Sequence, residues 1–121
     1  MNWAAVELIA GRVLLGGLFV FAGALKIVNP APFIAHMTEF HVPSFLLPAV
    51  IALELVGGLM VWSGWRMTWA ALALAFFCIA TALIFHFDFG NKAERTLFIK
   101  DLAIAGGLFI LAARSTLPTS A

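Results

Sequence analysis

Long apolar stretches separated by short polar or proline-rich segments constrain this chain more than any other feature. Of its 121 residues, 64% are hydrophobic and only 11% are charged. A soluble domain has about 45–50% apolar and roughly 25% charged residues, and one of this size leaves about a third of its unfolded-chain surface in water. The composition therefore excludes a soluble fold and indicates an integral membrane protein.

Only three segments can hold loops between apolar helices: the Asn29–Pro43 segment, the Ser63–Arg66 hairpin and the polar stretch over 88–95. Because a helix needs about 20 residues to cross the hydrocarbon layer, the sequence predicts four spans. We place them at 5–28, 44–62, 67–86 and 96–113 of a single transmembrane domain covering 1–121, with Ser44 as N-cap of the second span. The predicted fold is all-α, an integral membrane four-helix bundle with up-down topology, followed by a short tail over 115–121.

The first apolar stretch has a second interpretation. The run from Val13 to Phe21, followed by Ala22-Gly23-Ala24, is similar to a signal peptide with its cleavage site. Because Glu7 and Arg12 precede it, we interpret this stretch as the first span.

Four spans place both chain ends and the Ser63–Arg66 hairpin on one face, called side A, and the other two loops on the opposite face, called side B. The tryptophans lie near side A, as expected of interfacial anchors: Trp3, Trp62, Trp65 and Trp69. Lys and Arg occur near both faces, so the positive-inside rule favours a cytoplasmic side B only slightly. Glycine pairs inside three spans predict close helix packing: Gly16-Gly17, Gly57-Gly58 and Gly106-Gly107.

Two charged residues lie well inside the predicted spans. Glu54 lies ten residues after Ser44, and Arg12 lies seven residues after Ala5 on the antiparallel neighbour. At about 1.5 Å per residue, both are expected roughly 10–12 Å below side A, where they can meet. Because a charge in a span is costly, we predict a buried Arg12–Glu54 pair. The pair either fixes helix register or forms a binding site in which Glu54 meets a ligand head group.

A second polar group gathers at side B. Lys26 ends the first span, His86 ends the third, and Lys100 and Asp101 lie about one turn into the fourth. The two lysines are either part of a polar pocket or simply extend toward lipid head groups. Aspartate cannot extend far, so we expect Asp101 to face the bundle and pair with Lys26, Lys100 or His86.

The first side-B loop contains two histidines and a glutamate. Its mixture of apolar and polar residues over 32–40 predicts a short amphipathic helix on the membrane surface. His36, Glu39 and His41 could supply metal ligands, but they match no defined metal motif, and no metal site is predicted. A single cysteine, Cys78, excludes a disulfide within the chain and any multi-cysteine metal site.

The spans also carry a series of short motifs in a fixed order. These are Arg12 followed by Leu15-Gly16, Phe21-Ala22-Gly23-Ala24-Leu25-Lys26, Glu54-Leu55-Val56-Gly57-Gly58, His86, and Asp101-Leu102-Ala103-Ile104-Ala105-Gly106-Gly107. In this order and spacing the chain resembles the DoxX family, from about Gly11 to Ala113.

The resemblance implies a four-helix membrane protein of a bacterial or archaeal cell membrane. The family takes its name from a small subunit of a terminal quinol oxidase and thiosulfate:quinone oxidoreductase system, and relatives occur in membrane oxidoreductase complexes that handle thiol and oxidative stress. The family position of Asp101 is often asparagine, so the resemblance does not imply an essential proton role for that residue.

Three functions are consistent with these features. The first is a membrane anchor or quinone-interacting subunit of an oxidoreductase, not a catalyst on its own, with a soluble or membrane redox partner. No haem or iron–sulfur site can be built from these residues, so a quinone is the expected carrier. The second is a small-molecule or lipid-binding transporter, which would require a homo-oligomer. The third is a structural, stress-related protein of the lipid bilayer. With seven Lys+Arg against six Asp+Glu, no nucleic-acid partner is expected.

Overall fold

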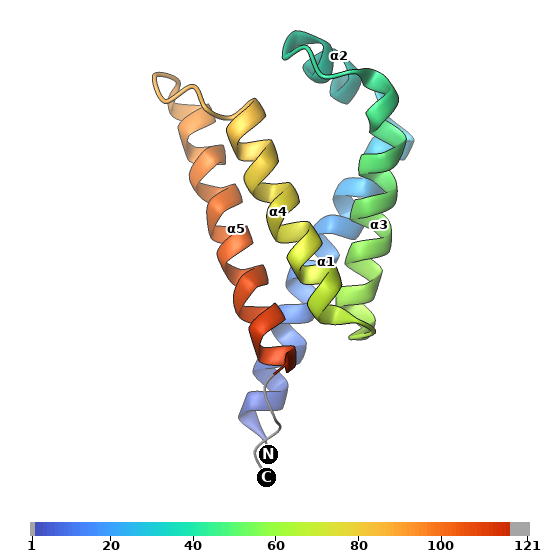
Figure 1. Cartoon of the computed structure of the whole chain (residues 1–121), viewed down its shortest axis with the longest axis vertical. Coiled ribbons are helices and arrows are strands. Elements are labelled where there is room, and N and C mark those ends of the chain that lie inside the picture. The colour runs from blue at the N-terminus through green and yellow to red at the C-terminus, as the bar shows by residue number, and fades with distance from the viewer. Residues whose placement is uncertain (1, 117–121) are drawn as a thin grey trace.

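The computed structural model describes residues 2–116, with side chains to residue 114, and every regular element in this range is a helix (Figure 1). The elements are α1 (Trp3–Val28), α2 (Ala31–Glu39), the 3-10 helix η1 (Ser44–Leu46), α3 (Leu47–Ser63), α4 (Met67–Phe85) and α5 (Lys92–Thr116). Four of them, counting η1 with α3, are long and apolar enough to cross a membrane. The predicted all-α fold with four spans is confirmed.

Side-chain caps move two helix starts to earlier positions than predicted. The Asn2 side chain accepts a hydrogen bond from the backbone N–H of Ala5, so α1 begins at Trp3. The Asn91 side chain accepts from the backbone N–H of Ala93 at 2.9 Å, so α5 begins at Lys92 instead of residue 96. Part of the polar stretch expected as a loop is therefore the first turn of a helix.

The expected N-cap at Ser44 is wrong. Ser44 begins η1 and makes no side-chain capping bond, and α3 starts at Leu47 with Pro48 in its first turn. At the other end of the chain, α5 continues to Thr116, so the first residues of the predicted tail are helical. Residues 117–121 of that tail lie outside the described residues.

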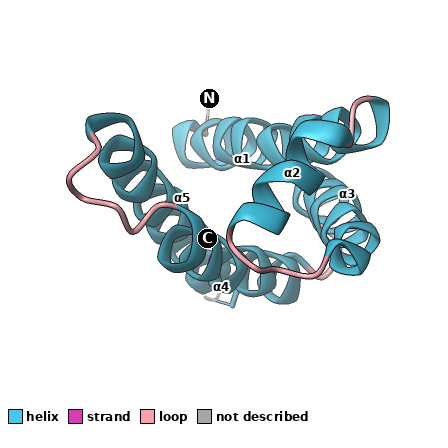
Figure 2. Cartoon of the chain, turned by 90° about the horizontal axis from the view of Figure 1, so that it is seen from above, coloured by secondary structure: helices cyan, strands magenta, loops and turns pink. Residues whose placement is uncertain are grey.

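The spans form two antiparallel pairs, α1 with α3 and α4 with α5. The pairs meet at side A, where the Ser63–Arg66 hairpin joins α3 to α4, and they diverge toward side B (Figure 1). The helix predicted over 32–40 exists as α2, and it crosses between the two pairs at the open end (Figure 2). The molecule is thus closed at one end and open at the other.

Glycines bring α1 and α3 into backbone contact. A Cβ atom added to Gly58 would lie 2.9 Å from the carbonyl oxygen of Gly16 and 2.8 Å from Cγ2 of Val20. Such close approach lets two helices gain dispersion contacts where lipid offers no hydrophobic drive. The packing role predicted for the glycine pairs does not extend to Gly106, because a Cβ there would meet nothing within 4 Å.

The buried core occupies the side-A half of the bundle. It is built from α1, α3, α4 and α5 and consists of Phe19, Val61, Met67, Ala70, Ala71, Leu74, Ala75, Cys78, Ala105, Leu108, Leu111 and Ala112. Alanines dominate α4, which lets α5 approach it closely. Because the core stops at about the level of Cys78, the side-B half of the bundle is left with internal space.

Candidate functional site

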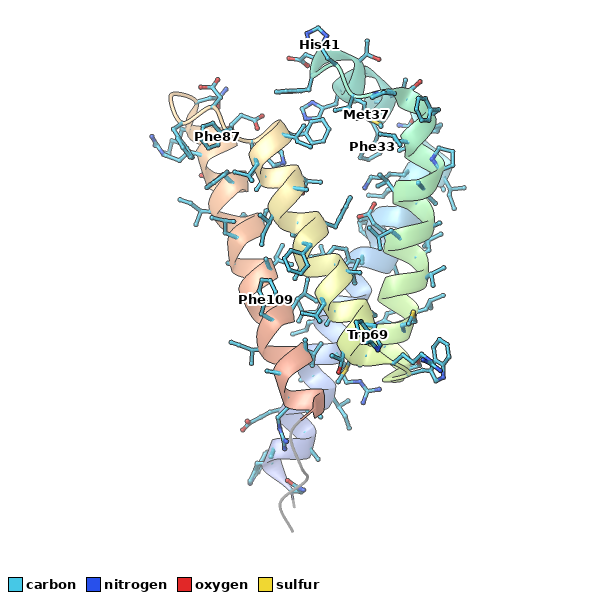
Figure 3. The ribbon with its side chains drawn as sticks, viewed as in Figure 1. Phe33, Met37, His41, Trp69, Phe87 and Phe109 are labelled. Atoms are coloured by element: carbon cyan, nitrogen blue, oxygen red, sulfur yellow. The ribbon has the colours of Figure 1, made fainter. Side chains whose placement is uncertain are left out.

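A cavity of about 520 Å³ lies between the two helix pairs in the side-B half, and all four spans and α2 contribute to its walls. Helix α2 crosses its open end and supplies Phe33 and Met37 (Figure 3). The remaining walls are mostly apolar side chains. The polar and charged lining residues are Lys26, His36, Glu54, Thr81, His86 and Asp101. This size and composition are typical of small-molecule sites.

One wall of the cavity carries a buried ion pair between α1 and α3. The Nζ atom of Lys26 lies 2.7 Å from Oε1 of Glu54, whose side chain is 4% exposed. A carboxylate oxygen has two lone pairs, so Oε1 can accept a further hydrogen bond beside its contact with Lys26. Lys26 also lies over the ring of Phe33, 4.7 Å from its centroid. The pair thus keeps capacity for a further polar contact at the cavity surface.

The predicted Arg12–Glu54 pair is wrong. Arg12 donates instead to the backbone carbonyls of Val61 at 3.1 Å and Trp62 at 2.7 Å, where α3 ends. The physical reason is the length of α1, whose first turns extend beyond the end of α3 and carry Arg12 with them. Glu54 lies seven residues before Val61, or about 10 Å deeper, and meets Lys26 from the opposite end of α1. Arg12 therefore caps the C-terminal end of α3.

The opposite wall carries a polar group from α4 and α5. His86 Nδ1 lies 2.7 Å from Oε2 of Glu94, and His86 Nε2 lies 3.8 Å from Oδ2 of Asp101. The Thr81 hydroxyl lies 3.3 Å from the same Asp101 oxygen and 3.0 Å from the carbonyl oxygen of Cys78. Asp101 lines the cavity, and of the three partners expected for it, Lys26, Lys100 and His86, the structure places His86 beside it. An imidazole between two carboxylates can hold and pass a proton.

The two lysines of the predicted side-B cluster lie in different places. Lys26 joins Glu54 on the facing wall rather than Asp101, and Lys100 is exposed and does not line the cavity. The two lysines therefore have different roles, although the sequence placed both near the same interface. A lysine that points outward from α5 can extend to lipid head groups.

The two histidines of the first side-B loop have separate positions. His36 stacks on Phe85 with ring centroids 5.0 Å apart, and Phe40 packs against both rings, so His36 closes the cavity next to α4. Its Nδ1 lies 4.0 Å from Oε2 of Glu39. His41 follows α2 with a positive φ of 60° and does not line the cavity. Among residues 2–114, no three His, Cys, Asp or Glu side chains are placed to hold a metal ion.

Two residues of the site were not predicted. Thr81 is a polar residue in an otherwise apolar span, five positions before His86, and its position was a usable signal. Glu94 fell in a stretch interpreted as a loop, and only the Asn91 cap shows that it belongs to the first turn of α5, facing His86. Cys78 is 3% exposed and borders the cavity.

Comparison with known proteins gives consistent results. Residues 7–87 match the sequence model of the DoxX family. Over 107 residues, covering 88% of this chain and 82% of the relative, the chain is 38% identical to the protein named "Inner membrane protein YqjF" of Escherichia coli (strain K12). No solved structure matches the chain. The family match includes Lys26, Glu54 and His86 and ends before α5, so it does not include Asp101.

Proposed function

The chain belongs to the DoxX family of multi-pass membrane proteins, and from this premise we propose that it is the quinone-binding membrane subunit of an oxidoreductase complex. The observation that carries the proposal is the cavity, which has apolar walls and polar groups on two facing sides. Lys26 and Glu54 stand on the α1–α3 pair, and His86 and Asp101 stand on the α4–α5 pair. A flat apolar ring with an oxygen atom at each end suits this chemistry.

The residues that would hold a quinone follow from their hydrogen-bonding capacity. The ammonium group of Lys26 can donate to one carbonyl oxygen, and the Thr81 hydroxyl or a His86 N–H can donate to the other. Aromatic rings, among them Phe33 and Phe77, line the space between. Bound there, a quinone supplies carrier chemistry for two electrons and two protons, while the chain supplies orientation and polar contacts.

The proposal includes a redox partner to deliver electrons, because a single cysteine cannot hold an iron–sulfur cluster and residues 2–114 place no three His, Cys, Asp or Glu side chains for a metal ion. The cavity opens toward side B, so we place the partner on that side. The E. coli relative is named an inner membrane protein, and we propose the same membrane for this chain. One chain provides every wall of the cavity, so a homo-oligomer is not required for the site.

The geometry supports quinone binding better than transport. Val61, Leu74 and Leu108 are fully buried between the cavity and side A, so transport would require this packed core to open, whereas binding of a quinone would not. The purely structural interpretation of the buried charges predicts a folded protein whose cavity holds no specific ligand. That difference can be measured directly.

The experiment is native mass spectrometry of the gently solubilised chain, with extraction and quantification of bound quinone. We expect about one quinone per chain in the wild type and after addition of a long-chain ubiquinone. Glu54→Gln is expected to lose it, because the variant changes the charge that holds Lys26 at the cavity wall. Glu7→Gln, at an exposed carboxylate near the side-A end of α1, is the matched control and is expected to retain it.

Circular dichroism and size-exclusion chromatography confirm that each variant is folded. A wild-type protein that neither retains nor takes up quinone would refute the proposal. A folded Glu54→Gln variant with full quinone content would show that Glu54 is not required for quinone binding.

A further inference from the structure

A second apolar hollow of about 400 Å³ lies on the outer surface between α3 and α4. Its walls carry no charged side chain, and we call it the seam groove; it is lined by Ala52, Leu53, Val56, Gly57, Met60, Trp69, Ala70 and Ala73. We propose that the seam groove holds the long apolar chain of the quinone whose ring occupies the cavity. This inference rests on the proposed function and specifies its ligand as a long-chain quinone.

The cavity and the seam groove follow one another along the same two helix faces. On α4, the residues spaced alternately by three and four are Ala70, Ala73, Phe77, Ala80 and Ile84, of which the first two line the seam groove and the last three line the cavity. On α3, the corresponding residues are Val50, which lines the cavity, and Leu53, Gly57 and Met60, which line the seam groove. Residues at this spacing share one face of a helix. The cavity and the seam groove therefore lie one after the other along the same faces of α3 and α4.

The seam groove faces lipid and is closed on its inner side. Val56 and Trp69 are 56% and 69% exposed, whereas Leu74 behind the groove is fully buried. A Cβ added to Gly57 would lie 3.1 Å from Cγ of Leu74, so no passage leads inward there. From Ala80 at the cavity to Trp69 at the far end is eleven residues, or about 16 Å of helix. An extended chain leaving the cavity can therefore follow the groove toward side A.

The cavity end of this track is polar. Glu54 is 3% exposed and borders the cavity, where its carboxylate is paired with the ammonium group of Lys26. A buried polar end followed by an apolar track along the lipid boundary is the arrangement expected for a ligand with a polar head and a long chain. A soluble ligand would have no use for the track.

The other seam, between α1 and α5, is the competing exit. Leu18 lines the cavity and is 42% exposed, and Ile104 faces it from α5. Beyond these residues, however, α1 and α5 come into contact, since a Cβ added to Gly107 would lie 3.8 Å from Cδ1 of Leu15. The seam groove is the track that the structure favours.

The test uses the full chain in lipid nanodiscs and a ubiquinone analogue with a photoreactive diazirine on its isoprenoid chain. After illumination, we expect mass spectrometry to find the label on peptides containing 52–60 and 69–73. Label confined to the peptides of α1 and α5 that contain Leu18 or Ile104 would overturn the proposal. So would label spread evenly over all lipid-facing surfaces.

A variant pair sharpens the result. Ala73→Phe fills the groove without touching the buried core, and Ala103→Phe places the same bulk on the exposed surface of α5, which lines neither hollow. Because lipid is as apolar as the groove, blocking the groove is expected to change the location of the isoprenoid chain more than the affinity of the quinone. We therefore expect loss of the label from 52–60 and 69–73 in Ala73→Phe only. Unchanged labelling of these peptides in Ala73→Phe would overturn the proposal that the seam groove holds the isoprenoid chain.

Quinone content separates this proposal from the previous one. If the protein binds quinone but the label is found on other peptides, the seam-groove proposal fails and the quinone-site proposal stands. A protein in which excess tail-less benzoquinone and excess long-chain quinone both fail to compete with the analogue has no specific quinone site, and both proposals then fail.

Discussion

The ammonium group of Lys26 lies 2.7 Å from a carboxylate oxygen of Glu54, so the last turn of α1 is tied to the middle of α3 at the cavity wall. Both charges sit in the low-dielectric part of the chain, where removing one partner leaves the other uncompensated. The pair therefore links the two helices and forms part of the cavity wall.

Lys26→Met is expected to lower the free energy of unfolding by roughly 3–5 kcal/mol, because it leaves Glu54 charged and buried. Glu54→Gln is expected to cost less, because the Lys26 side chain is 15% exposed and can extend toward side B. Denaturant unfolding in detergent micelles measures both. The double variant Lys26→Met/Glu54→Leu is the control and should recover most of the loss. A double variant as unstable as Lys26→Met would contradict the ion pair.

Gly58→Ala is expected to destabilise the α1–α3 pair by about 1–3 kcal/mol, the usual cost of overpacking. The added methyl group would lie 2.9 Å from the Gly16 carbonyl oxygen, and backbone atoms cannot yield as a side chain can. Gly106→Ala is the matched control, because nothing lies within 4 Å of its added methyl group. It should be neutral or stabilising, since alanine is the better helix former. Thermal unfolding of the two variants side by side gives the comparison, and equal midpoints would refute the close contact.

Arg12→Met is expected to cost about 2 kcal/mol, because charge-assisted hydrogen bonds to the last carbonyls of α3 are lost. Arg66→Met provides the comparison: Arg66 is exposed at the same hairpin and lies over the Trp65 ring at 5.2 Å. Its loss should cost no more than about 1 kcal/mol. The same unfolding assay tests both substitutions. If Arg12→Met were as mild as Arg66→Met, the helix-terminal role of Arg12 would be wrong.

Cys78 provides a reporter of cavity occupancy, because it is the single cysteine of the chain and borders the cavity. A small membrane-permeant maleimide should modify it slowly, and saturation with a long-chain quinone should slow the modification further. Cys78→Ser controls for reaction at other groups. Modification is followed by intact-mass spectrometry over time. Identical rates with and without quinone would place the quinone outside the cavity.

Much of the fold could be predicted because lipid imposes a simple requirement on the chain. Four apolar stretches of sufficient length predict four helices, and the tryptophans near side A and the helix over 32–40 follow from the same pattern. Glu54 could be identified as exceptional for a related reason, since a carboxylate inside a span needs a partner. The caps at Asn2 and Asn91 lie outside the apolar pattern, and the helix starts were therefore predicted less well.

The partner of Glu54 could not be predicted, because it depends on the register between two helices. That register is set by the contact between Gly16 and Gly58, which places the α1 terminus beyond the end of α3. The predicted register places Arg12 opposite Glu54, whereas the observed one places it opposite Val61 and Trp62, seven to eight residues away, so Lys26 is the cation that reaches Glu54. The His86–Asp101 contact was easier to predict, because a short loop joins α4 and α5 and keeps their ends at the same depth.

Because the buried core occupies only the side-A half of the bundle, the packing around each spanning helix is dense near side A and looser near side B. Amides of α4 near Ala71 lie in a dense core, whereas those near Phe85 border the cavity. Local opening costs most free energy where buried contacts are dense, so hydrogen exchange along α4 should quicken from side A to side B. The side-A half of the bundle is therefore expected to open less often than the side-B half, where the helix ends border the cavity.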